Sequence, residues 1–149
     1  MATRTTMHVE VVTAEGELYS GEADQVEAPG AEGQLGILPR HAPLLTTLAE
    51  GPLQIRLGDA EETLWVSGGF LEVSKNKVTV LADAGQHAED IDQARAEEAR
   101  RRAQDRLADA QSNLERAELQ AQLQRELSRL RVVEIARRSG RRHIRYPEQ

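Results

Sequence analysis

The sequence predicts an α+β protein, with an N-terminal β-sandwich of about ten short antiparallel strands followed by a C-terminal two-helix antiparallel hairpin. Two observations predict this fold. Up to Ala84 the chain consists of short apolar runs interrupted by Gly and Pro, which is typical of a small sandwich or barrel. From Glu89 there is no Gly or Pro until Gly140, and nearly all residues favour helix. We therefore expect a sandwich over residues 1–88, a helical hairpin over residues 89–138 and a disordered basic tail over residues 139–149.

The expected strands follow one another closely along the first part of the chain. In residues 53–57, Leu and Ile alternate with Gln and Arg, which places one face of a strand in a core and the other in water. Residues 75–77 (KNK) supply a hairpin turn, and Gly68 and Gly69 mark a bend or bulge where no side chain fits. The runs that we expect to form strands are residues 7–13, 25–28, 34–38, 53–57, 63–67, 70–74 and 78–82.

The helical part is expected to form two helices that can separate from the sandwich. Asp90 or Asp92 can cap the first helix, and the sequence at Ser112 is the expected break before the second. The first helix presents an Ala stripe and the second a Leu ridge. Because each buried methylene contributes only about 0.8 kcal/mol, an Ala stripe holds such a hairpin weakly. The stripe is Ala96, Ala99, Ala103, Leu107 and Ala110, and the ridge is Leu119, Leu123, Leu127, Leu130 and Val133.

Composition excludes several classes of protein. The chain has 149 residues and only 3% aromatic residues, so its core must be modest in size and aliphatic. It has no cysteine, which excludes disulfides and thiolate metal sites. It contains neither an apolar run long enough to span a membrane nor an apolar segment behind a basic N-terminus. We therefore expect no membrane span and no secretory signal, and a cytoplasmic location.

The balance of charged residues changes near residue 88, where the hydrophobic periodicity also changes. Residues 1–88 contain five Lys or Arg and thirteen Asp or Glu, whereas residues 89–149 contain fourteen and twelve. The excess of Arg is largest from Arg125 onward. Arg pairs with carboxylates and phosphates through two parallel hydrogen bonds, so the end of the chain favours an acidic or phosphate-bearing partner.

Four motifs carry a resemblance to a known family. They are residues 33–43 (GQLGILPRHAP), 67–73 (SGGFLEV), 78–82 (VTVLA) and 89–96 (EDIDQARA). With them the chain resembles the epsilon subunit of bacterial F-type ATP synthases from near its start to about Arg138. The resemblance implies a non-catalytic subunit with no required cofactor, peripheral at the cytoplasmic face of the plasma membrane. It would reach the membrane only through the c-ring of a proton-translocating complex.

The resemblance also implies how the two parts work. The sandwich would bind the gamma subunit and the c-ring, with Glu32, Arg40 and His41 in the loop that meets them. The hairpin would either fold against the sandwich or extend along gamma toward the catalytic beta and alpha subunits, and the extended form would inhibit ATP hydrolysis. The residues that would meet acidic beta-subunit side chains are Arg125, Arg129, Arg131, Arg137 and Arg138.

One of these motifs resembles the ATP-binding sequence of some bacterial epsilon subunits. The resemblance implies a regulatory ATP site, although Gln86 stands where an acidic residue is expected. The other interpretation is structural, with Asp92 capping a helix and Ala96 packed inside. The residues of the implied ATP site are Ile91, Asp92, Arg95, Ala96, Arg102, Arg125 and Arg129.

Enzymatic functions find no support in the sequence. It contains no Walker-type phosphate loop, no Gly-x-Ser-x-Gly and no His-Glu-x-x-His. The four histidines, His8, His41, His87 and His143, are too scattered to predict a metal site, and we expect the carboxylate pair Glu61 and Glu62, like the pair at residues 97–98, on solvated faces. The alternative from another class is a module that binds nucleic acid or an acidic partner through the Arg-rich C-terminus. The net charge of −6 and the lack of aromatic residues within the basic run disfavour nucleic acid as a partner.

Overall fold

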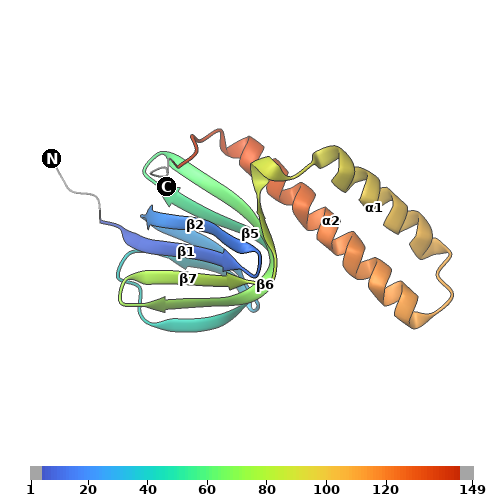
Figure 1. Ribbon diagram of the computed structural model, residues 1–149, viewed down its shortest axis with the longest axis horizontal. Coiled ribbons are helices and arrows are strands. Elements are labelled where there is room, and N and C mark those ends of the chain that lie inside the picture. Colours follow the sequence, from blue (N-terminus) through green and yellow to red (C-terminus); the bar gives the residue numbers. More distant parts are fainter. Residues whose placement is uncertain (1–4, 145–149) are drawn as a thin grey trace.

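The computed structural model describes residues 5–144, which form a β-sandwich followed by two contacting helices (Figure 1). Eight strands, rather than about ten, build the sandwich within this range. A short 3₁₀ turn, η1 (Ala88–Asp90), leads into the hairpin of α1 (Gln93–Ala108) and α2 (Asn113–Ser139). The strands are β1 (Met7–Thr13), β2 (Gly16–Ala23), β3 (Gln25–Gly30), β4 (Gly33–Ile37), β5 (Leu44–Leu57), β6 (Ala60–Ser74), β7 (Lys77–Ala82) and β8 (Gly85–His87).

The strand count is lower than expected because two strands are long. β5 and β6 have 14 and 15 residues and pair with each other along nearly their whole length. The strands follow the order β2-β1-β7-β6-β5-β3-β4. β7 pairs with the second half of β6, at residues 69–74, and β8 pairs with the first half, at residues 64–66. Each long strand therefore contributes to both layers. Most pairs are antiparallel, but β1 and β7 run parallel, which the sequence analysis did not expect.

Gly69 allows β6 to pass from one layer to the other. Its φ is 114°, and a Cβ atom there would lie 2.0 Å from the carbonyl oxygen of Leu81. Only glycine fits this combination of backbone conformation and close approach. The expected bend at Gly68 and Gly69 is thus present, inside one strand rather than between two. The turn at residues 75–77 also forms as expected, with Lys75 and Asn76 at positive φ.

Two apolar clusters hold the molecule together. The larger one fills the sandwich with aliphatic side chains and Tyr19. The smaller one joins the sandwich to the hairpin and contains Trp65 of β6, Ile91 of the linker (residues 88–92) and Val132 of α2. Figure 1 shows that α2 approaches the sandwich at one end only, while the tips of both helices project away from it. We call this arrangement the folded position of the hairpin.

The hairpin begins and ends at the residues that its sequence favours. Asp92 is the N-cap of α1 and Ser112 the N-cap of α2, each accepting a backbone N–H at 3.1 Å. The helices have 16 and 27 residues, and α1 packs on α2 through Ala96, Ala103 and Leu119. Among the described residues no helix is long and apolar enough to cross a membrane.

The chain turns back to the sandwich after α2. Gly140, at φ 59°, ends the helix in the left-handed conformation. Arg142 then forms a bridge with Ala60, the first residue of β6, and the side chain of Ile144 is buried in the sandwich core. The sequence analysis expected a disordered tail from Ser139; in the described range Ser139 is the last residue of α2, and Arg142 and Ile144 contact the sandwich. Residues 145–149, the rest of the expected tail, lie outside the described range.

Candidate regulatory site and interfaces

A pocket of about 620 Å³ opens between the linker, α1 and the middle of α2. The linker contributes Ile91 and Asp92, and the first turns of α1 contribute Arg95, Ala96 and Arg102. Arg129 reaches the pocket from α2, across the hairpin. Six of the seven residues of the implied ATP site therefore line one cavity.

Asp92 and Arg95 also have the structural role that the alternative interpretation gave them. Oδ1 of Asp92 accepts the backbone N–H of Arg95, and its other oxygen lies 3.7 Å from the Arg95 guanidinium. The Arg95 side chain is 87% exposed. Its guanidinium is therefore free to turn toward a ligand without breaking a buried contact. The helix cap needs only the carboxylate of Asp92 and the backbone N–H of Arg95.

Arg129 is held by two neighbours that the sequence analysis did not single out. Its guanidinium carbon lies 4.3 Å from the centroid of the Trp65 ring, and Nη1 donates to Oε1 of Glu126 at 2.9 Å. Cation–π contact and ion pair together fix the guanidinium at the pocket wall. Nε of Arg129 is buried and has no hydrogen-bond partner among the described residues.

Charges of both signs surround the pocket. Arg95, Arg102 and Arg129 contribute three positive charges, and the acidic lining residues are Asp90, Asp92, Glu98 and Glu126. A polyanion such as a nucleoside triphosphate would meet a lining that is not strongly basic. A divalent cation bound to the phosphates would reduce the repulsion by the carboxylates.

Arg125 is the residue of the implied ATP site that the structure places elsewhere. Its Nε lies 3.9 Å from Oε2 of Glu50 on β5, so it links α2 directly to the sandwich. Burial raises the pKa of Glu50, and the charges of Arg125 and Arg129 act in the opposite direction. Arg125 therefore marks the folded position of the hairpin rather than the pocket.

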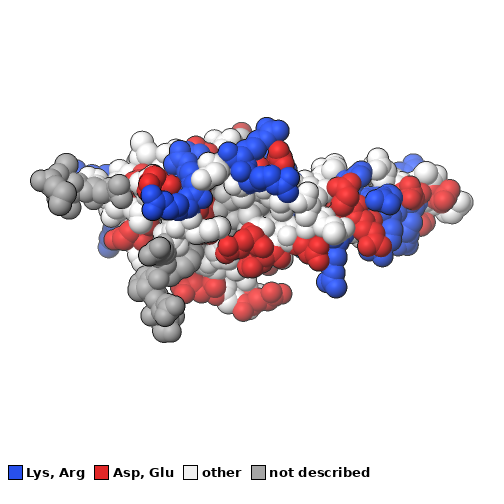
Figure 2. All heavy atoms as spheres, turned by 90° about the horizontal axis from the view of Figure 1, so that it is seen from above, with Lys and Arg blue, Asp and Glu red and all other residues white. Residues whose placement is uncertain are grey.

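Two other basic residues of α2 are engaged within the chain. Nη2 of Arg137 donates to Gln93 at 2.8 Å, and Nε of Arg138 pairs with Glu134 at 2.8 Å. Arg131 lines a shallow groove beside Glu50. Figure 2, which views the molecule of Figure 1 from above, shows groups of basic side chains with acidic ones among them. The basic surface is therefore partly neutralised in the folded position.

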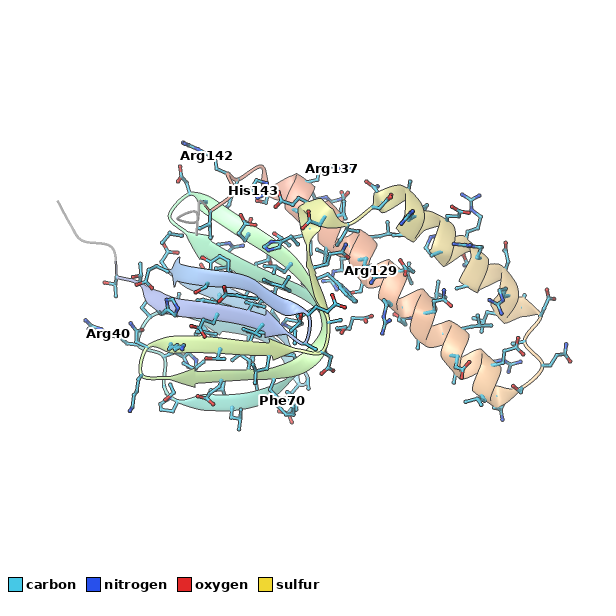
Figure 3. The ribbon with its side chains drawn as sticks, in the orientation of Figure 1. Arg40, Phe70, Arg129, Arg137, Arg142 and His143 are labelled. Atoms are coloured by element: carbon cyan, nitrogen blue, oxygen red, sulfur yellow. The ribbon has the colours of Figure 1, made fainter. Side chains whose placement is uncertain are left out.

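The residues expected to meet gamma and the c-ring do not form one cluster. Glu32 lies in the turn between β3 and β4, whereas Arg40 and His41 follow the opposite end of β4. Five strand residues separate the two ends, or about 16 Å at 3.3 Å per residue. Arg40, at φ 65°, donates its backbone N–H to Oδ1 of Asn76 and lies at the sandwich end far from the hairpin (Figure 3).

An exposed apolar patch lies on the sandwich, with Phe70 well away from Arg40 (Figure 3). Phe70 of β6 is paired in register with Leu81 of β7 and with Thr47 of β5, two residues from Leu45. Leu45, Phe70 and Leu81 are 70%, 53% and 54% exposed. Large apolar side chains adjacent to one another in water are typical of a protein interface. The sequence analysis did not predict this patch, because alternation alone does not identify which face is covered.

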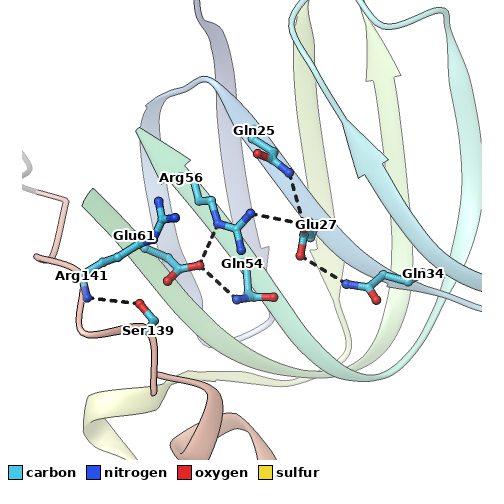
Figure 4. A network of polar contacts seen from close by, with 8 residues as sticks. All are labelled: Gln25, Glu27, Gln34, Gln54, Arg56, Glu61, Ser139 and Arg141. Atoms are coloured by element: carbon cyan, nitrogen blue, oxygen red, sulfur yellow. Dashed lines mark hydrogen bonds and ion pairs between the residues drawn. The ribbon is translucent and has the colours of Figure 1, made fainter. Parts of the chain in front are cut away.

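Glu61 and Glu62 are buried, and the expectation that they lie on a solvated face was wrong. Their exposed fractions are 5% and 3%. Figure 4 shows Oε1 of Glu61 accepting hydrogen bonds from Gln54 and Arg56, at 3.0 Å each. Both carboxylates are covered because the segment after α2 folds back over β6, and no local signal in the sequence announces this long-range contact.

Glu62 brings together two histidines that are far apart in the sequence. Burial alone would raise the pKa of Glu62, but His87, the backbone N–H of Ile144 and His143 outweigh it and lower that pKa. The carboxylate of Glu62 in turn raises the pKa of His87, against the effect of burial. His87 and His143, which are too far apart in the sequence to suggest a shared site, therefore share one carboxylate partner.

A β-sandwich joined by one linker to a helical hairpin, with a pocket at the joint, defines a two-part protein architecture. Comparison with protein families agrees. Residues 6–88 match the family "ATP synthase, Delta/Epsilon chain, beta-sandwich domain", and residues 89–134 match "ATP synthase, Delta/Epsilon chain, long alpha-helix domain". The chain belongs to the epsilon chains of ATP synthase, and it is a non-catalytic subunit.

Individual relatives support the same assignment. The chain is 49% identical over 135 residues to the ATP synthase epsilon chain of Acidithiobacillus ferridurans, covering 91% of this chain and 96% of that one. It is 47% identical over 140 residues to the epsilon chain of Halorhodospira halophila, covering 93% and 99%. A chain in the Euglena gracilis mitochondrial ATP synthase structure of OSCP, F1 and c-ring has the same fold, with a TM-score of 0.74, 18% identity, and coverage of 91% and 84%.

Proposed function

We propose that this epsilon chain is a component of the central stalk that couples the catalytic core of a proton-translocating ATP synthase to the c-ring. In this role the sandwich binds the gamma subunit and the c-ring, and the hairpin inhibits ATP hydrolysis when it extends toward the beta and alpha subunits. The proposal places the protein at the cytoplasmic face of the bacterial plasma membrane, with the c-ring as its only link to the bilayer. Family membership supports the stalk role, and the two-part fold supports the regulatory one.

The exposed patch of the sandwich is the candidate surface for gamma. Leu45, Phe70 and Leu81 present adjacent apolar side chains that a subunit surface would remove from water. Arg40 and His41 lie near the strand ends of the same half of the sandwich and suit the polar contacts of a c-ring loop. Glu32, at the other end of β4, would touch a different part of that assembly.

Inhibition would operate by population shift between the folded and the extended hairpin. Extension breaks the contact of Arg125 with Glu50 and that of Arg129 with Trp65. It releases Arg125, Arg129, Arg131, Arg137 and Arg138 to pair with acidic side chains of the beta subunit. A ligand or partner can favour one position only by binding it more tightly than the other.

ATP is the proposed regulatory ligand of the pocket. The observation that carries this proposal is that one cavity at the joint collects Ile91, Asp92, Arg95, Ala96, Arg102 and Arg129 from three separate elements. The Arg129 guanidinium places a positive charge at the pocket wall, and the exposed Arg95 side chain is free to move. Because the cavity exists only while α1, α2 and the linker are together, bound ATP would stabilise the folded position by mass action.

Isothermal titration of the full chain with ATP, with and without magnesium, tests the ligand. We expect binding that is tighter with magnesium and that Arg102→Ala weakens about tenfold or more, through loss of a charged hydrogen bond. Arg101→Ala removes the neighbouring Arg of the same helix, which does not line the pocket, and should bind ATP as the wild type does. Equal affinity of both variants, or no binding at millimolar ATP, would exclude this pocket.

Truncation after Asp90 tests inhibition within the assembled ATP synthase. The sandwich would remain to hold gamma and the c-ring, so assembly should be intact and ATP hydrolysis should rise. Hydrolysis no faster than in the complete enzyme would show that the hairpin is not an inhibitor.

A further inference from the structure

We propose that Glu62, His87 and Glu89 form a binding site for a transition-metal dication, with Zn²⁺ as the best-suited ion, where β6, the linker and the segment after α2 meet. One ligand atom from each residue can be chosen so that all three lie within 4.8 Å of one another. None of these residues lines the proposed ATP pocket. The site is therefore a separate feature of the joint between sandwich and hairpin.

His87 presents a lone pair to this site. Its Nε2 lies 2.7 Å from the carbonyl oxygen of Leu18, and because a carbonyl only accepts, Nε2 must carry a proton and donate. In the neutral ring Nδ1 is then unprotonated. A backbone carbonyl that fixes the tautomer of the second ring nitrogen is the usual partner of a metal-ligating histidine.

Glu62 faces that lone pair. Its Oε2 lies 3.5 Å from Nδ1 of His87, and Nδ1 is buried with no hydrogen-bond partner among the described residues. A carboxylate that faces this nitrogen in a nearly dry site favours a cation there, which is a proton on Nδ1 or a metal ion that displaces it. A separation of 3.5 Å suits two ligands of one tetrahedral ion with bonds of about 2.0–2.2 Å.

The remaining oxygen of Glu62 is fixed in place by the segment after α2. Oε1 accepts the backbone N–H of Ile144 at 2.9 Å and the Nδ1–H of His143 at 3.1 Å. These bonds orient the carboxylate so that Oε2 points toward His87. The partners of Glu62 thus hold the carboxylate in one orientation, which reduces the ordering cost of binding an ion.

Glu89 completes the site from the linker. Its side chain is 54% exposed, and its Oε2 lies 3.4 Å from Nε2 of His143. A carboxylate on this rim can turn inward without leaving a buried charge. Two carboxylates and one imidazole are ligands that Zn²⁺ accepts, with water at the fourth position, whereas Mg²⁺ prefers an all-oxygen octahedral shell.

A bound ion would resist extension of the hairpin. It would tie the linker that precedes α1 to β6, on the carboxylate that also holds Ile144. The ion would therefore stabilise the folded position by mass action. This consequence rests on the proposed inhibitory function, but metal binding itself does not.

Titration of the chelator-treated full chain with Zn²⁺ tests the site. We expect one ion per chain, and at least about tenfold weaker binding in Glu89→Gln and in His87→Gln, because each substitution removes a ligand. His41→Gln, which removes a half-buried histidine elsewhere, is the matched control and should bind as the wild type does. Mg²⁺ should not compete at equal concentration. Absence of saturable Zn²⁺ binding, or equal binding by all three variants, would overturn the proposal.

A second measurement does not depend on variants that fold. In amide and imidazole NMR spectra of the wild type, Zn²⁺ should shift the resonances of Glu62, His87, Glu89 and Ile144. His8 lies 3.4 Å from Glu10 and 3.8 Å from Glu22 and is the competing surface cluster. Shifts confined to that cluster would overturn the assignment. If Zn²⁺ binds as expected but ATP hydrolysis by the assembled enzyme is unchanged, the metal site stands and its link to inhibition fails.

Discussion

Asp92 shows how one residue can belong both to a helix cap and to a ligand site. Its carboxylate accepts the Arg95 backbone N–H and also lines the pocket. The two roles predict different chemistry, because a cap needs only an acceptor oxygen whereas a phosphate- or magnesium-bearing ligand is sensitive to charge.

Substitution of Asp92 separates the two roles. Asp92→Ala should lower the free energy of unfolding by about 1 kcal/mol, because the first turn of α1 loses its cap. Asp92→Asn keeps an acceptor oxygen and should leave stability nearly unchanged while still altering the affinity for magnesium ATP. Chemical denaturation measures the first effect and calorimetric titration the second. Equal loss of stability in both variants would contradict the capping role.

Tyr19 predicts a stability change at high pH. Burial first, and then the charges of Glu62 and Glu22, raise the pKa of Tyr19 to about 12, and its hydroxyl donates to the carbonyl oxygen of Glu22. The unfolded chain releases this proton near pH 10, whereas the folded chain retains it. The contribution is therefore fully present below pH 10 and is lost as the pH rises toward 12.

The matched comparison is Tyr19→Phe. Between pH 10 and 12 the wild type should lose about 3 kcal/mol more unfolding free energy than the variant, from the two-unit difference in pKa. Urea denaturation at a series of pH values measures both. Parallel pH profiles for the two proteins would mean that Tyr19 is not the controlling group.

At the scale of the element, the contact of α2 with the sandwich is small and well defined. Val132 is 0% exposed and belongs with Trp65 and Ile91 to the cluster at the joint. Trp65 is the only tryptophan in the chain, so its emission reports on this contact alone.

Val132→Asp should release α2 from the sandwich. An unpaired buried charge costs about 3–5 kcal/mol, which is large relative to one small apolar cluster. Trp65 would then become exposed, and its fluorescence should shift to longer wavelength while the β-sheet signal in circular dichroism remains. Leu127→Asp, at a position of α2 that is 41% exposed, should leave the emission unchanged. A similar shift in both variants would point to general unfolding of the helix instead.

The elements differ in how far their sequence determines them. Both helices and the break at Ser112 were predicted correctly, because capping residues and the absence of Gly and Pro are local signals. β2 was not predicted, since Glu, Ser and Gly there give no apolar run and only pairing with β1 makes it a strand. The expected strands 63–67 and 70–74 are halves of β6, since the two glycines bend a continuous strand.

The residues of the candidate site also differ in how far the sequence alone identifies them. The resemblance to ATP-binding epsilon subunits, rather than helical spacing, named the six residues that line the pocket. Trp65, Glu126 and the cluster around Glu62 could not be predicted, since each depends on contacts between segments tens of residues apart. A local motif can be recognised in the sequence, whereas the contact of residues 142–144 with β6 depends on the whole fold.

At the scale of the whole molecule, regulation requires that each contact of the folded position be weak, and that all of them together hold the hairpin on the sandwich. The hairpin is held by one apolar cluster, by Arg125 with Glu50, by Arg129 on Trp65, and by the segment that ends at Ile144. Partly exposed ion pairs contribute at most about 1 kcal/mol each. A partner with several acidic groups could therefore compete with them, and small changes at the joint would alter the balance between positions.

A reversible cross-link across the joint would test that balance. The chain has no cysteine, so Glu50→Cys with Arg125→Cys provides a unique pair at a contact of 3.9 Å between the native side chains. A short cleavable bismaleimide should lock the hairpin in its folded position. If extension causes inhibition, the locked enzyme should hydrolyse ATP faster than the unlinked double variant, and cleaving the linker should restore the inhibited rate. Each single-cysteine variant, treated with the same reagent, controls for modification alone. Locked and unlinked enzymes with the same rate would mean that the hairpin does not have to leave the sandwich for hydrolysis to be inhibited.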